Sequence, residues 1–200
     1  SGPCRVCTIT GRRLMRGDLL LVDAAANVEY LSGDITRTYP VSGTFTPEQR
    51  TLYALVLAAQ DAGIEVARQG GSLAAIHRRT VEVVRNGLAA LGLITKTDDT
   101  QYLLWFMHGA THYIGIDVHD VGDRTLPLRS GMAFVIEPGL YIDPGFLDRL
   151  ADSEETRAFV AQVKPAVMKF AGLGVRIEDS FLVEDRGLVH LSHAVPRTPA

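Results

Sequence analysis

The sequence has only two cysteines among its 200 residues, Cys4 and Cys7, and a single tryptophan. Two thiols do not build a disulfide framework, and no second Cys/His pair completes a zinc site around this C-x-x-C pair. A redox motif is expected to open a helix after a strand, and CRVCTITG does not begin a helix. We interpret the two cysteines as thiols of a short terminal strand, with a redox or half-zinc site as the alternative.

Long apolar runs and an excess of one charge are also missing. The longest apolar runs, such as Leu19–Val22, are far too short to cross a bilayer, and SGPCRVCTITGRR lacks the apolar core of a secretory signal. The 20 Lys and Arg residues balance 23 Asp and Glu residues, and no basic stripe marks a nucleic-acid surface. We expect a cytoplasmic protein of one domain, without a nucleic-acid or membrane partner.

The order of predicted strands gives the fold class. Leu19–Ala24 is predicted as a strand, and Asn27–Tyr30 leads into a second strand that ends at Val41. Four short apolar segments in the second half are predicted as further strands: Leu103–Met107, Tyr113–Val118, Met132–Glu137 and Val175–Val183. Strands interleaved with helices on one side predict an α+β fold with a mainly antiparallel sheet.

Three helices are predicted between these strands. Thr46 and Gln49 form a capping box that starts a helix, which ends at a Gly-Gly pair. Ser72 can cap a second helix. A third covers Glu154–Phe170, where Pro165 is expected to kink or interrupt it.

Five side chains with metal-binding chemistry fall in or beside the predicted strands: Asp23, Asp34, His112, Glu137 and Glu178. Four carboxylates that met in a core would repel one another and raise one another's pKa values. Two divalent cations would remove that repulsion, and a set of four carboxylates and one imidazole suits such a pair. Singly, each residue has a simpler interpretation as a turn former, a cap or a strand-end charge. The joint pattern predicts a two-metal hydrolase.

Four strings, in this order, resemble one enzyme family: VDAAANVEYLSGDITRTYPV, FMHGATHYIGIDVHDVG, IEPGLYI and VRIED. They resemble the catalytic domain of the Xaa-Pro aminopeptidases (aminopeptidase P) and prolidases, M24 metallopeptidases with the pita-bread fold. The resemblance implies a mainly antiparallel curved sheet with helices on its outer face and an incomplete first half. It also implies that residues 16–200 are the C-terminal part of this catalytic domain, and that residues 1–15 are a divergent N-terminal segment.

The resemblance implies a role for each metal-binding side chain. Asp23 would bind one ion, His112 and Glu137 would bind the other, and Asp34 and Glu178 would bridge both. Because oxygen-rich sites favour hard cations, the two divalent ions are expected to be Mn2+, with Co2+ or Zn2+ as alternatives.

Further residues match positions that handle the substrate in this family. His119 would contact the scissile peptide group and stabilise the developing oxyanion, and Glu137 would relay a proton. His108, also counted among the catalytic residues, and Arg176 would line the pocket on the proline side of the scissile bond. The family has another histidine upstream of the first aspartate, and Val6 stands at that position here.

These implications together predict an Xaa-Pro aminopeptidase, a dinuclear metal-dependent exopeptidase. It would hydrolyse the bond between an N-terminal residue and a following proline, so its partner would be a peptide with proline in second position. HGATH favours the aminopeptidase over an Xaa-Pro dipeptidase (prolidase). A non-catalytic pita-bread binding protein is the other alternative, because the upstream histidine is missing. The full-length form is expected to be a homodimer or a higher homo-oligomer.

Overall fold

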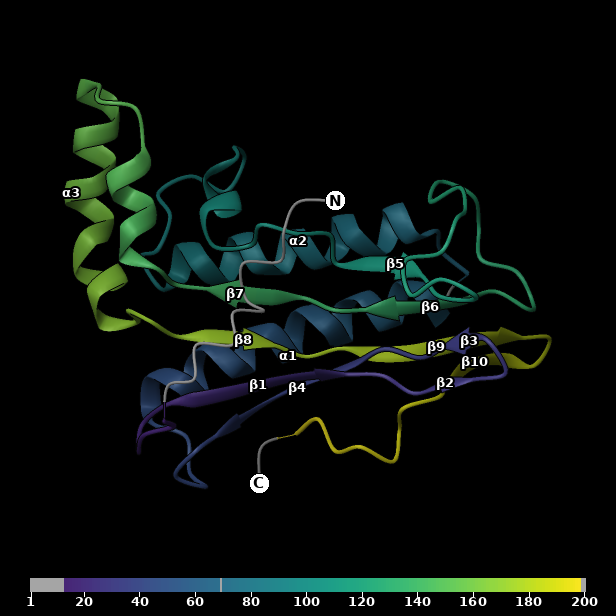
Figure 1. Cartoon of the computed structure of the whole chain (residues 1–200). Helices are drawn as coiled ribbons and strands as arrows, with labels where there is room; N and C mark the ends of the chain where they lie inside the picture. Colours follow the sequence, from purple (N-terminus) through teal and green to yellow (C-terminus); the bar gives the residue numbers. More distant parts are fainter. Residues whose placement is uncertain (1–12, 69, 199–200) are drawn as a thin grey trace.

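The computed structural model describes residues 13–68 and 70–198 of the chain (Figure 1). Cys4, Cys7, Val6 and most of the predicted segment 1–15 lie outside the described residues. The described elements follow in this order: β1 (Leu19–Ala24), β2 (Asn27–Val28), β3 (Leu31–Ser32), β4 (Ile35–Pro40), α1 (Pro47–Arg68), α2 (Leu73–Ala90), η1 (Gln101–Leu104), β5 (Thr111–Tyr113), β6 (Ala133–Ile136), β7 (Gly139–Tyr141), η2 (Pro144–Arg149), α3 (Glu154–Lys169), β8 (Gly174–Arg176), β9 (Asp179–Glu184) and β10 (Gly187–His190).

Antiparallel pairing joins every strand of the described part of the chain to a neighbour. One sheet has the order β10-β9-β6-β5, and β1-β4, β2-β3 and β7-β8 form separate pairs. A single antiparallel bridge between Thr36 and Glu178 ties β4 to the segment between β8 and β9. This bridge places the β1-β4 hairpin beside the four-stranded sheet.

The two long helices begin where the sequence predicts. The backbone N–H of Gln49 donates to Thr46 Oγ1 at 3.3 Å, and the N–H of Thr46 donates to Gln49 Oε1 at 2.9 Å, which confirms the capping box. Ser72 Oγ accepts from the N–H of Ala75 at 3.2 Å. Figure 1 shows α1 and α2 side by side behind the strands, with α3 upright at one end of the molecule. No helix of the described residues is long and apolar enough to cross a membrane.

The core lies between the long helices and the strands. Its largest fully buried side chains are Trp105, Phe106, Phe134, Phe181, Leu52, Leu73, Ile76, Leu88, Leu93, Ile136, Leu140 and Ile142. Because these side chains come from both helices and from β6, β7 and β9, burial fixes the face that each strand turns toward α1 and α2. The opposite face is free to carry polar groups.

Three of the predicted element bounds were wrong. Leu103–Met107 is not a strand: the chain forms the 3-10 turn η1, and Trp105 Nε1 donates to the carbonyl oxygen of Leu93 at 2.9 Å. Tyr113–Val118 is a strand only at its first residue, where β5 ends. Val175–Val183 divides into β8 and β9, which belong to different sheets.

Pro165 was predicted to kink or interrupt the third helix, and the interruption is wrong. α3 runs as one helix from Glu154 to Lys169 and includes Pro165. Proline removes one backbone donor from the helix. Val163 and Val167, on either side of it, are fully buried, and their packing holds the helix together.

Candidate metal centre

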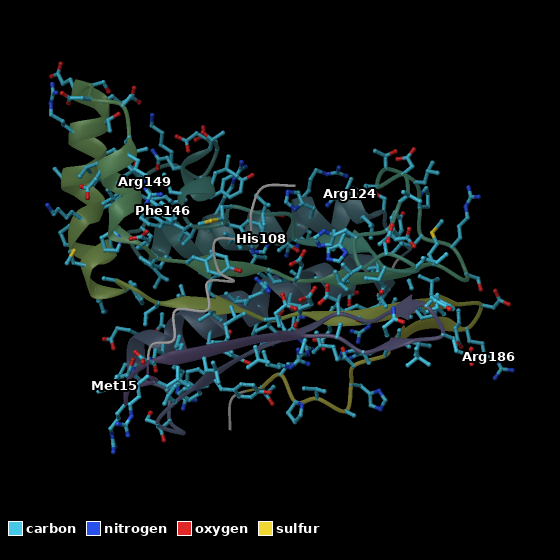
Figure 2. All side chains as sticks on the ribbon, viewed as in Figure 1. Met15, His108, Arg124, Phe146, Arg149 and Arg186 are labelled. Atoms are coloured by element: carbon cyan, nitrogen blue, oxygen red, sulfur yellow. The ribbon has the colours of Figure 1, made fainter. Side chains whose placement is uncertain are left out.

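The five residues predicted as metal ligands come from strand ends that meet on the polar side of the sheets. Asp23 lies in β1 opposite Thr36, and Asp34 stands directly before β4. His112 lies in β5, Glu137 follows β6, and Glu178 lies between β8 and β9. In Figure 2, side-chain oxygen and nitrogen atoms gather along the middle of the strands, close to the labelled His108.

His112 is the centre of this cluster. Its Nε2 lies 3.5 Å from Glu137 Oε1, 3.8 Å from Asp34 Oδ2 and 3.9 Å from Glu178 Oε1. Its Nδ1 faces the carbonyl oxygen of Tyr113 at 3.1 Å, so Nδ1 carries the proton and Nε2 presents a lone pair. His112 Nε2 and Glu178 Oε1 are buried and have no hydrogen-bond partner among the described residues.

Burial changes the acidity of these groups. Burial is the main cause that raises three carboxyl pKa values, and a neighbouring carboxylate is the second. The pKa of Asp34 rises to about 7 beside Asp23, and that of Glu178 rises to about 8 beside Asp34. The pKa of Glu137 rises to about 9 beside Glu178. Burial lowers the pKa of His112 to about 4, so its imidazole is neutral at neutral pH. A neutral imidazole lone pair surrounded by carboxylate oxygens fits divalent cations, which would satisfy the unpaired atoms.

Asp23 lies at the open edge of the cluster. Its side chain is 40% exposed and forms an ion pair with the guanidinium of Arg176, whose side chain is buried. Arg176 also donates to the hydroxyl of Tyr141 and to Thr36 Oγ1, both at 3.1 Å. Arg176, predicted to line the substrate pocket, therefore lies among the carboxylates and is held by three partners.

The two histidines predicted to handle the substrate flank the cluster. His108 lies between the carbonyl oxygen of Gly109, 2.8 Å from Nδ1, and the Tyr141 hydroxyl, 3.0 Å from Nε2. Its Nδ1 is 3.9 Å from Glu137 Oε2, and burial lowers its pKa to about 4. His119 is exposed, and its ring meets that of His112 edge-on, with centroids 4.2 Å apart. The structure thus brings both histidines to the site.

Sequence reasoning missed two residues of the site. Thr36 Oγ1 donates to Glu178 Oε2 at 2.6 Å, and the Tyr141 hydroxyl connects His108 with Arg176. Thr36 follows Asp34 by two residues, a spacing that puts both side chains on one face of a strand. Tyr141 stands in IEPGLYI, four residues after Glu137. Strand alternation could therefore have indicated Thr36, but it gives no signal for Tyr141.

The chain matches the model of metallopeptidase family M24 over residues 3–185. The Xaa-Pro aminopeptidase of Haemophilus influenzae is 37% identical over 199 residues, which cover 95% of this chain and 42% of that protein. The Xaa-Pro aminopeptidase of Escherichia coli K12 is 35% identical over 192 residues, which cover 92% of this chain and 40% of that protein. The chain therefore spans about two fifths of the length of these relatives.

Solved structures of aminopeptidase P are also similar to this chain. Proline aminopeptidase P II from Yersinia pestis is similar with a TM-score of 0.75 and 36% identity, over 94% of this chain and 41% of that one. Zn-substituted Escherichia coli aminopeptidase P in complex with product is similar with a TM-score of 0.74 and 34% identity, over the same shares. The α+β pita-bread fold that the sequence predicts is confirmed. The chain belongs to metallopeptidase family M24, and membership of this family implies that divalent metal ions are bound.

Proposed function

We propose that this chain carries the metal centre of an Xaa-Pro aminopeptidase, which removes an N-terminal residue that precedes proline. The observation that carries the proposal is the cluster around His112 Nε2. Donor atoms of Asp34, His112 and Glu178 lie within 4.8 Å of one another, and His112 Nε2 and Glu178 Oε1 are buried with no hydrogen-bond partner in the part of the chain that the structure describes. The similarity to Xaa-Pro aminopeptidases over more than nine tenths of this chain supports the same conclusion.

We infer two ions from the five proposed ligands, of which Asp34, His112 and Glu178 already form one group that could hold an ion. His112 Nε2 lies 3.5 Å from Glu137 Oε1, whereas Asp23 pairs with Arg176 at the open edge of the cluster. Asp34 and Glu178 lie near His112, and burial together with the charge of Asp23 raises the pKa of both, so each could offer an oxygen to either ion. We therefore assign Asp23 to one ion, His112 and Glu137 to the other, and Asp34 and Glu178 to both. Because most donors are carboxylate oxygens, Mn2+ is the proposed metal.

Two divalent cations held here would lower the pKa of water and polarise the scissile carbonyl group. Glu137, which is mostly buried, would accept a proton and pass it on. His119, exposed beside His112, can donate a hydrogen bond to the carbonyl oxygen as negative charge develops there. His108, which the Tyr141 hydroxyl holds in place, would contact the proline side of the substrate.

The substrate preference follows from the chemistry of the bond. An X-Pro bond has no N–H, so enzymes that bind an extended peptide through backbone hydrogen bonds lose one of these bonds there. A pocket for the pyrrolidine ring would replace that contact. The free α-amine of the peptide would bind at the carboxylate end of the site, which would restrict cleavage to the first residue.

The test combines metal binding with peptide cleavage. Protein treated with chelator is titrated with Mn2+ in a calorimeter and then incubated with an Xaa-Pro-Xaa tripeptide and with an Xaa-Pro dipeptide. We expect two ions per chain and release of the first residue from the tripeptide. Cleavage of the dipeptide alone would identify a prolidase, and two ions without cleavage would favour the non-catalytic binding protein. Absence of metal binding would overturn the proposal.

Three finer points remain predictions from the sequence: manganese as the natural metal, a cytoplasmic location and a homo-oligomeric assembly. The division into segments 1–15 and 16–200 is likewise a prediction. Metal analysis of protein purified without added ions and sedimentation of the purified protein would test the first and the third.

A further inference from the structure

We propose that Thr36 is a positioning residue of the metal centre, whose hydroxyl aims the Glu178 carboxylate at the ions. The inference rests on the proposed function, because it concerns the affinity of this site for divalent cations. Thr36 is not itself a proposed ligand: its hydroxyl donates to Glu178 and accepts from Arg176.

The direction of these hydrogen bonds follows from the donors. Thr36 is completely buried, and its hydroxyl lies 3.1 Å from Arg176 Nε and 2.6 Å from Glu178 Oε2. The Nε–H group of arginine can only donate, so the Thr36 hydroxyl accepts from Arg176. Its single hydrogen is then available for Glu178. A chain of two hydrogen bonds therefore runs from Arg176 through Thr36 to the carboxylate.

Thr36 fixes Glu178 at two places. The backbone N–H of Glu178 donates to the carbonyl oxygen of Thr36 at 3.0 Å, while the Thr36 hydroxyl holds Oε2. Arg176 Nε lies 4.0 Å from Oε2, too far for a direct hydrogen bond. Among the described residues, the Thr36 hydroxyl is therefore the group that keeps Oε2 turned away from His112. Oε1 is left facing His112 Nε2, 3.9 Å away.

Thr38, two residues further along β4, provides a matched control. It is 2% exposed, its hydroxyl donates to the carbonyl oxygen of Arg176 at 3.0 Å, and it accepts from the backbone N–H of Arg176 at 3.1 Å. Thr36→Val and Thr38→Val each remove a buried hydroxyl from strand β4. Thr36→Val leaves the Nε–H of Arg176 without this acceptor, and Thr38→Val does the same to the backbone N–H of Arg176. Only Thr36→Val removes a hydrogen bond to a proposed ligand.

The experiment compares Mn2+ titrations of the wild type, Thr36→Val, Thr36→Ser and Thr38→Val, with the circular dichroism spectrum and thermal midpoint of each. Removal of a group that orients a metal ligand weakens affinity roughly 10- to 100-fold, and we expect Thr36→Val to lose that much. Thr36→Ser keeps the hydroxyl and should restore most of the affinity. Thr38→Val should lower the thermal midpoint and leave the affinity for Mn2+ unchanged. If Thr36→Val does not fold, Thr36→Ala replaces it.

Two results would overturn the role of Thr36 and leave the proposed function intact: unchanged Mn2+ affinity in Thr36→Val, or an equal loss in Thr38→Val. Failure of the wild type to bind any divalent cation would instead overturn the proposed function, and the role of Thr36 with it. The wild-type titration thus separates the two failures.

Discussion

At the scale of single residues, the site combines like charges in a buried volume. Glu178 shows the conflict most clearly, because its side chain is 2% exposed and one of its oxygens has no hydrogen-bond partner among the described residues. Burial of an unpaired carboxylate is costly unless a cation or a proton compensates it. The residue is therefore suited to bind metal and poorly suited to a purely structural role.

Glu178→Gln should weaken the binding of both ions, because the residue is proposed to bridge them. The amide keeps the size of the side chain and removes its charge. A Mn2+ titration of this variant should show a lower affinity at both steps. Glu184→Gln, at the exposed end of the same strand β9, is the matched control and should bind as the wild type does. Unchanged binding by Glu178→Gln would contradict the bridging assignment.

His119→Ala should lower turnover without loss of metal. The side chain is exposed beside His112 and is proposed to donate to the oxyanion, and removal of one such donor typically lowers kcat about 10²- to 10³-fold. Turnover of an Xaa-Pro tripeptide and metal content per chain are the two measurements. His193→Ala, an exposed histidine near the C-terminus, serves as control. Loss of metal from His119→Ala would make His119 a ligand.

At the scale of elements, a second buried network joins β4, β9 and the C-terminal segment behind the metal centre. The five N–H groups of Arg37 all have acceptors: Nη1 donates to the carbonyl oxygens of Thr36 and Glu178, Nη2 to Asp179 Oδ1 and the Val195 oxygen, and Nε to the Pro196 oxygen. Asp179 Oδ2 accepts from Gln60 of α1 at 3.0 Å. Arg37 therefore holds the strand ends from which two proposed ligands project.

Arg37→Met should destabilise the fold strongly, because it leaves Asp179 buried without its guanidinium. Breaking such a pair costs about 3–5 kcal/mol. We expect a loss of about 3 kcal/mol, since Ser192 Oγ and Gln60 Nε2 also donate to the Asp179 carboxylate, at 2.6 Å and 3.0 Å. Urea unfolding measures the change. Arg68→Met, which removes an exposed arginine that lies 3.9 Å from Glu65, should change stability little; an equally small effect in Arg37→Met would refute the argument.

The helices were easier to predict than the strands, and the reason is local. Thr46 and Gln49 make reciprocal contacts within one turn, so their pattern is visible in the sequence. The apolar run Leu103–Met107 suits a strand and a buried helical turn equally, and the hydrogen bond from Trp105 to the carbonyl oxygen of Leu93 is a contact that the run itself does not reveal. The division of Val175–Val183 depends on Thr36, which is distant in sequence.

The same distinction applies to the site. The five proposed ligands stand in strings that resemble a family, so they could be named in advance. Thr36 and Tyr141 contribute through hydrogen bonds to residues 142 and 35 positions away, which no local pattern encodes. Arg176 was predicted near the substrate, but its contacts with Asp23 and Thr36 required the folded chain.

At the scale of the whole molecule, the buried carboxylates make stability depend on pH. Folding raises the pKa values of Glu178 and Glu137 to about 8 and about 9, so these two groups hold more protons in the folded chain than in the unfolded chain up to about pH 9. Stability therefore falls as pH rises through this range. His108 and His112 act in the opposite sense, but only between their folded pKa of about 4 and the unfolded value of 6.5.

In protein treated with chelator, the thermal midpoint should decrease between pH 6.5 and pH 9, where the carboxylates act alone. Each kcal/mol lost lowers the midpoint of a chain of this size by about 2–4 °C. Saturating Mn2+ should raise the midpoint and flatten this decrease, because cations replace the protons. Differential scanning calorimetry at several pH values tests both effects. A thermal midpoint that does not change with Mn2+ and rises toward pH 9 would contradict the proposed metal centre.

The bridge between Thr36 and Glu178 joins residues 142 positions apart, and it has a kinetic consequence. The β1-β4 hairpin and the α1-α2 pair are close in sequence and can form early, whereas the metal centre needs β8 and β9, which leave the ribosome much later. Contacts of such long range slow folding. Ions bound by the finished centre would therefore act mainly on escape from the native state: they would lengthen its lifetime and leave the folding rate almost unchanged.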